Sequence, residues 1–222
     1  MPSTAYSTFQ SMRQDVRDLI SAHYVLENQH HVPRETLGYF VRSAIVMLCA
    51  AWERYNEDLL LEVVDLSVAG AIDASVLPEE VRKTISGRIK RDKNELSPML
   101  LVDSGWKGIW RAYASDEIDA LNTPNRGKLN ALFHSYFGLP EYSRFWTDEG
   151  RHHMNKFVAD RGEIAHNGNR ARAIDIEELR TYHEMVVSCV IEIDSNMGCE
   201  MGVRTNVGPT AWDRTYARDE DV

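Results

Sequence analysis

An arginine and a histidine stand five residues apart in the segment ADRGEIAHNGN, residues 159–169. At 100° per residue, Arg161 falls at the centre of an apolar arc on its helix. A guanidinium on such an arc is partly removed from water, which is costly unless an anion compensates it. Two interpretations follow: a structural ion pair within the chain, with Glu53 as the nearest candidate partner, or a site that receives an external anion.

His166 lies where this helix is expected to stop, because Asn and Gly in the NGN segment readily adopt the left-handed C-terminal conformation. On an ideal helix, five residues separate two side chains by about 140°. We expect the helix end to free His166 from that direction, so that it can turn towards Arg161. Arginine binds phosphate bidentately and imidazole transfers protons near neutral pH, so the pair is suited to phosphodiester chemistry.

This spacing alone has low specificity. Arg17 and His23 are separated by six residues within the first expected helix. His23 falls on the packing face of that helix, so we interpret it as a core or surface histidine rather than a catalytic one.

Helical periodicity dominates the chain, and alternating strand patterns are nearly absent. Prolines, glycines and capping residues predict the helix ends. Thr123 is expected as an N-cap with Pro124 at the first helical position, and Asp175 with Glu178 resembles a capping box. The expected helices cover residues 5–28, 33–70, a short segment after Pro78, 123–138, 147–167 and 175–198, whereas 94–121 is not assigned.

These elements predict an all-α fold, an antiparallel helical bundle with irregular insertions. The 222 residues contain no evident linker. We therefore expect a single helical domain over residues 1–198 and a loosely structured C-terminal tail over 199–222.

The net charge of −9 argues against a protein that coats nucleic acid non-specifically. Two local basic segments remain, residues 81–93 and 151–172, and for the first a solvated helix face is the favoured interpretation. The net charge does not exclude an enzyme with such a local basic patch.

Other features predict ordinary roles. The longest apolar run is too short to span a membrane, and the first residues lack the pattern of a secretion signal, so a cytoplasmic location is expected. Three cysteines and the histidine pairs at 30–31 and 152–153 lack metal-ligand spacing, so neither a metal nor a cofactor is expected. Trp106, Trp110 and Tyr113 fit helix packing better than base stacking.

RGEIAHNG resembles the signature of the HEPN superfamily (higher eukaryotes and prokaryotes nucleotide-binding), in which Arg and His separated by four to six residues form a ribonuclease site. The preceding segments SAIVMLCAAWERYNEDLL and LNTPNRGKLNALFHSYFGL, with the final apolar helix, resemble the RiboL-PSP-HEPN branch. The resemblance extends discontinuously from about residue 36 to 195, and the ordered set of segments is more specific than the Arg/His pair.

The resemblance implies a metal-independent endoribonuclease of the toxin or antiviral-defence type, acting as a homodimer whose Arg/His pairs meet at the interface. His166 would activate the RNA 2′-hydroxyl or protonate the leaving 5′-oxygen, and Arg161 would hold the scissile phosphate. The products would carry 2′,3′-cyclic phosphate and 5′-hydroxyl ends. Glu53 matches a recurrent acidic position and would either orient the pair or form a structural ion pair.

The sequence departs from the resemblance at two positions. Gly162 stands where many family members have Asn, Asp or His directly after the arginine, and Glu163 or Asn167 is a weak candidate to substitute for it. The tyrosine that follows the histidine in toxins with a nucleotidyltransferase antitoxin is missing, so a neutralising partner of that kind is less supported. The alternative function is a catalytically inactive HEPN module that binds RNA, nucleotide or a protein.

Overall fold

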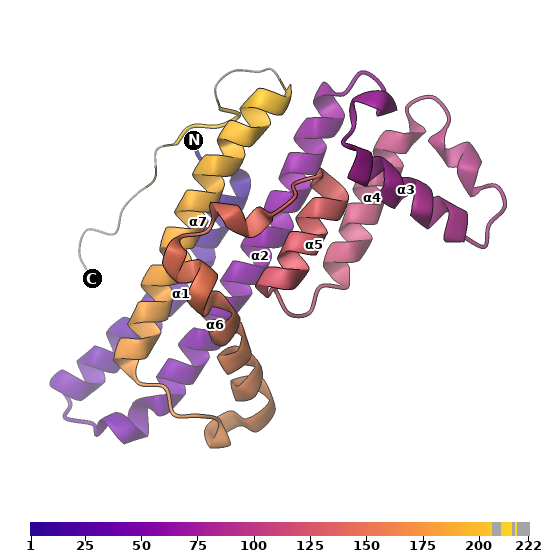
Figure 1. Cartoon of the computed structure of the whole chain (residues 1–222). Helices are drawn as coiled ribbons and strands as arrows, with labels where there is room; N and C mark the ends of the chain where they lie inside the picture. Colours follow the sequence, from indigo (N-terminus) through magenta and orange to yellow (C-terminus); the bar gives the residue numbers. More distant parts are fainter. Residues whose placement is uncertain (206–209, 215, 217–222) are drawn as a thin grey trace.

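Four helices form the main bundle of the protein (Figure 1). A computed structural model describes residues 1–205, 210–214 and 216, which contain seven α-helices and no strand. The bundle comprises α1 (Thr4–Asn28), α2 (Gly38–Gly70), α6 (Asp148–Asn167) and α7 (Ile176–Thr205). The long helix α2 contacts the other three. The predicted all-α helical bundle is therefore confirmed.

Several helix ends occur where the sequence predicts them. The Thr147 hydroxyl accepts a hydrogen bond from the Gly150 N–H at 3.1 Å and caps α6. Helix α5 (Arg126–Phe137) stops at Gly138, whose φ of +70° lies in the left-handed region that glycine adopts without strain. The second helix was expected to begin at Pro33, but the 3-10 helix η1 (Arg34–Leu37) follows Pro33 and α2 begins only at Gly38.

The predicted helix after Pro78 and the unassigned residues 94–121 fold together as an insertion that extends away from the bundle beside α5 (Figure 1). It contains η2 (Ala74–Val76), α3 (Glu79–Arg91), η3 (Ser97–Leu101) and α4 (Gly105–Asp119). Trp106 and Trp110 on α4 are buried, and the Trp110 indole donates a hydrogen bond to the Tyr136 carbonyl at 2.9 Å. These tryptophans serve packing, as the sequence favoured. The remaining short helices are η4 (Tyr142–Phe145) and η5 (Gly168–Arg170).

The predicted start of α5 is wrong. Asn125, not Thr123, is the N-cap, and its side-chain oxygen accepts a hydrogen bond from the Lys128 N–H at 3.0 Å. Pro124 lies outside the helix because its carbonyl accepts a hydrogen bond from the buried Trp52 indole at 3.1 Å. A tertiary contact thus decides the start of the helix.

The last helix extends beyond the expected end at residue 198, to Thr205. After it, Trp212 is buried and its indole donates a hydrogen bond to the Asp194 carbonyl at 3.0 Å. The Asp194 carboxylate is also buried and accepts hydrogen bonds from Ser3 and Tyr216. The described part of the expected tail is therefore fixed to α7. The rest of that prediction lies outside the described residues, at 206–209, 215 and 217–222.

None of the helices that the structure describes is both long and apolar enough to cross a membrane.

The close approach of α6 to α7 gives a test of the packing. A Cβ at Gly150 would lie 2.1 Å from the Cys189 Sγ, so Gly150→Ala should destabilise the protein by about 2 kcal/mol in urea unfolding. Gly108→Ala is the matched control, because a Cβ on that α4 glycine meets nothing within 4 Å. The control should be neutral or gain up to about 1 kcal/mol, and equal effects of the two changes would contradict the packing described.

Candidate functional site

Arg161 occupies a half-buried position on α6 and has no carboxylate directly against it. Its Nε is buried and lacks a hydrogen-bond partner, and among the described residues the side chain forms no ion pair. The structural ion pair with Glu53 that the sequence allowed is not formed in this structure. The guanidinium therefore retains its capacity to bind an anion.

The surface of α2 that faces Arg161 carries Glu53 and Cys49. Burial raises the pKa of Glu53, while the positive charges of Arg161 and then Lys128 lower it. Burial also raises the pKa of the Cys49 thiol to about 12, with Arg161 and Glu53 acting in opposite directions. Glu53 thus lies near enough to Arg161 for electrostatic attraction but does not neutralise it by contact.

His166 is exposed in the last turn of α6. We expected the helix end to free it, but α6 continues through Asn167 and stops at Gly168, whose φ is +56°. Helical geometry therefore keeps His166 about 140° around the axis from Arg161. A single chain presents the imidazole outward and the guanidinium towards α2, and the structure does not bring the two side chains into contact.

The two weaker candidates lie close to the pair in sequence but contact other groups. The Glu163 carboxylate accepts a hydrogen bond from the Arg172 N–H at 2.9 Å, so it holds the chain that follows the helix. Asn167 is exposed, and its side chain makes no hydrogen bond with the described residues. The supporting role expected of Glu163 and Asn167 therefore stays a prediction.

Gly162 itself lies beside open space. A Cβ built there meets nothing within 4 Å, and its φ is not in the left-handed region. Neither packing nor backbone strain therefore requires glycine at this position.

An ionic cluster that the sequence analysis missed fixes the segment after His166. The Arg172 guanidinium donates hydrogen bonds to Asp160 at 2.6 Å and to Glu178 at 2.8 Å. Lys156 also contacts both carboxylates, and the Tyr182 hydroxyl donates to Asp160 at 2.6 Å. The bond from Arg172 lowers the pKa of Glu178 to about 2, despite its partial burial. The i, i+4 spacing of Lys156 and Asp160 was the one signal in the sequence.

Only half of the capping box predicted for Asp175 and Glu178 is formed. The Asp175 side chain accepts a hydrogen bond from the Glu178 N–H at 2.8 Å, as a capping box requires. The Glu178 carboxylate, however, binds Arg172 and Lys156 instead of returning to the start of the helix.

Glu57 is a second residue that the sequence analysis did not select. It lies one turn after Glu53, and burial, with a smaller contribution from Glu53, raises its pKa to about 7. Its contact with Arg54 is long, at 3.8 Å. No group of three or more metal-binding side chains occurs among the described residues.

Comparison with protein families assigns the class to which the chain belongs. The RiboL-PSP-HEPN family model matches residues 11–197, so the chain belongs to this family of the HEPN superfamily. No curated protein and no solved structure matches the chain.

The raised pKa of Glu57 predicts a pH dependence of stability. Because its folded value of about 7 exceeds the ordinary 4.5, the native state binds more protons between these pH values. Wild-type stability should therefore fall as pH rises through this window. Glu57→Gln removes the titration, so its stability relative to wild type should increase by about 1 kcal/mol from pH 5 to pH 8, allowing for solvent screening.

Urea unfolding at four pH values between 5 and 8 measures this difference. Glu184→Gln, on an exposed position of α7, is the control for a carboxyl-to-amide change. If both variants follow the wild-type pH profile, the assignment of a high pKa to Glu57 is wrong.

Proposed function

We propose that this protein is a metal-independent endoribonuclease of the toxin or antiviral-defence type, with Arg161 and His166 as its catalytic residues. The observation that carries the proposal is the buried, unpartnered Nε of Arg161. A guanidinium held partly dry without a contacting carboxylate is suited to bind a scissile phosphate and the negative charge that develops on it. Family membership supports the same assignment, since HEPN domains are often ribonucleases.

The proposed reaction is an internal transfer at phosphorus. The RNA 2′-oxygen attacks the adjacent phosphorus, its proton leaves to a base, and the 5′-oxygen departs with a proton. His166, exposed in the last turn of α6, is the candidate to move these protons. The products carry a 2′,3′-cyclic phosphate and a 5′-hydroxyl, and no metal is required for this step.

We further propose that the active form is a homodimer. The outward direction of His166 and the inward direction of Arg161 leave the pair apart in one chain. A second copy against this end of α6 would bring an imidazole from one protomer towards the anion held by the other. A structured RNA such as tRNA, a neutralising protein and a cytoplasmic location belong to the same proposal and rest on the family resemblance and on charge.

Incubation of the purified protein with total cellular RNA in EDTA tests the activity. Arg161→Ala and His166→Ala should each reduce the cleavage rate by about a hundredfold or more, the loss typical of a preorganised transition-state contact. Arg161→Lys retains the charge but loses bidentate binding and should also be impaired. The product 3′ ends should accept poly(A) tailing only after the cyclic phosphate has been removed.

His153→Ala is the matched control, because His153 is exposed on the same helix. The His153→Ala variant should cleave RNA as the wild type does. Light scattering of the wild-type protein should give the mass of two chains. Intact RNA with the wild-type protein, or cleavage that survives both alanine changes, would overturn the proposal and support a non-catalytic HEPN module.

Gly162→Asn tests the departure from the family pattern. The open space at this position accommodates the side chain, and an amide there can donate one hydrogen bond to the phosphate. A hydrogen bond to a charged group is worth about 1.5 kcal/mol, so the cleavage rate should rise roughly tenfold. Gly162→Ala, which adds helix propensity without a donor, should leave the rate unchanged, and an equal gain in both variants would refute a role for the donor.

A further inference from the structure

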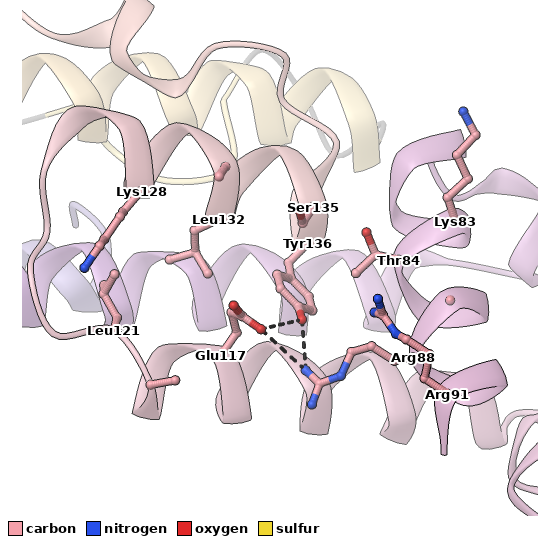
Figure 2. Close-up of a pocket in the computed structure, with 13 residues that line it drawn as sticks. Lys83, Thr84, Arg88, Arg91, Glu117, Leu121, Lys128, Leu132, Ser135 and Tyr136 are labelled. Carbon is pink, nitrogen blue, oxygen red and sulfur yellow. Dashed lines mark hydrogen bonds and ion pairs between the residues drawn. The ribbon is translucent and has the colours of Figure 1, made fainter. Parts of the chain in front are cut away.

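The insertion and α5 enclose a groove of about 870 Å³ that the proposed active site does not include (Figure 2). Helices α3, α4 and α5 supply its walls, and its lining contains four cations and one carboxylate, Glu117. Carboxylates pair with two of these cations, Lys83 and Arg88, so Arg91 and Lys128 remain as local positive charge in a chain whose net charge is −9. Such a groove attracts anionic ligands more strongly than the overall charge indicates.

One of these cations, Arg88, has a structural role, because its guanidinium is already bound by groups of the protein. Its guanidinium donates hydrogen bonds to the Tyr113 carbonyl at 2.8 Å and the Tyr136 hydroxyl at 2.9 Å, and pairs with Asp116 at 2.9 Å. It also lies 4.1 Å from the centre of the Tyr113 ring. Arg88 thereby joins α3, α4 and α5, so the groove is already formed without a ligand.

The cations that remain available lie at opposite ends of the groove (Figure 2). Lys128 donates a hydrogen bond to the neutral Asn122 side chain, at 2.9 Å, and forms no ion pair with the part of the chain that the structure describes. Arg91 is exposed and forms no ion pair or side-chain hydrogen bond with the described residues. Lys83, near Arg91, is already paired with Glu79 and Glu80. Two separated cations suit a chain of phosphates better than one small anion.

The middle of the groove is suited to the remaining parts of a nucleotide chain. Leu121, at the Lys128 end, and Leu132 add apolar surface, and the Thr84 and Ser135 hydroxyls add hydrogen-bonding groups. Contact of sugars and bases with such apolar surface is favourable because it removes both from water.

Gly87 leaves part of the α3 wall of the groove without a side chain. It lies inside α3 and lines the groove, yet a Cβ built on it meets nothing within 4 Å. A glycine within a helix is less favourable than alanine, and here no packing inside the chain explains it. Its place on the groove wall lets a ligand approach the helix backbone closely.

A cation of the groove and a cation of the candidate active site both act electrostatically on Glu53. Lys128 at the end of the groove lowers the pKa of Glu53, as does Arg161. Glu53 thus lies within electrostatic reach of both cations.

We propose that the groove between α3, α4 and α5 binds the phosphate backbone of a single-stranded RNA segment that flanks the cleavage site, with Arg91 and Lys128 as its phosphate ligands. That the ligand is RNA rests on the proposed function. Its binding residues are separate from Arg161 and His166, so the two proposals can fail independently.

Fluorescence anisotropy with a 5′-labelled, unstructured 20-nucleotide RNA tests the groove. The protein is the full chain carrying His166→Ala, so that the probe is not cut. In this background, Arg91→Ala with Lys128→Ala should weaken binding roughly tenfold or more and reduce the salt dependence of log K by about 1.4, the slope of two lost phosphate contacts. Gly87→Glu should also weaken binding, and Gly87→Gln should have a smaller effect.

Lys93→Ala is the matched control, because Lys93 is an exposed cation just past α3 that does not line the groove. It should bind RNA as the parent does. Thermal unfolding of the Arg91, Lys128 and Lys93 variants should match the parent because these side chains are exposed. The Gly87 variants should be as stable as the parent or slightly more stable, since glycine within a helix is unfavourable and space surrounds it. Equal weakening by Lys93→Ala, or an unchanged salt slope in the double variant, would overturn the proposal.

A competition experiment distinguishes RNA from an acidic polypeptide as the ligand of the groove. Poly-L-glutamate at equal charge should not displace the RNA, and full displacement would assign the groove to an acidic polypeptide instead.

Kinetics of the active protein distinguish failure of the groove proposal from failure of the nuclease proposal. The groove variants should raise KM more than they lower kcat. Cleavage with unaltered KM would overturn the groove and retain the nuclease, whereas groove-dependent binding without cleavage would retain the groove and overturn the nuclease.

Discussion

The incomplete hydration of Arg161, without a carboxylate in contact, is the constraint on which the functional argument depends. A half-buried guanidinium loses part of its hydration, and proteins commonly compensate such a loss with a direct ion pair. Here the nearest acid, Glu53, attracts the charge from a distance and leaves the Nε without a partner. The bundle therefore maintains a cation whose hydrogen-bonding capacity is unused, and this distinguishes Arg161 from the many paired arginines of the chain.

Helix α2 connects this site to the rest of the molecule. Its Cys49 and Glu53 lie near Arg161, and burial raises the pKa of Glu57, one turn further on, to about 7. Near neutral pH, part of the negative charge on this helix is therefore absent where an RNA backbone would approach. The bundle supplies the chemical groups, while the insertion adds a basic surface beyond Lys128. Positive charge is thus concentrated locally in a chain whose net charge is −9.

The sequence predicted those features that depend on local chemistry. Gly138 and Thr147 set helix ends through backbone preference and capping, and the position of Arg161 on an apolar arc indicated its partial burial. Features that depend on tertiary contacts were missed. Trp52 holds Pro124 outside α5, Glu163 binds the chain at Arg172 instead of a ligand, and Arg88 joins three helices to form the groove. No periodicity within one segment encodes such contacts, because each partner lies in another element.

The ionic cluster that follows His166 has a consequence for how this family can vary. The orientation of the imidazole depends on where α6 ends, and Asp160, Arg172 and Glu178 hold the chain at that end. Loss of one charge leaves its partners partly buried and uncompensated. Substitutions at these three positions should therefore accumulate together among related proteins, as covariation between residues that never touch the substrate.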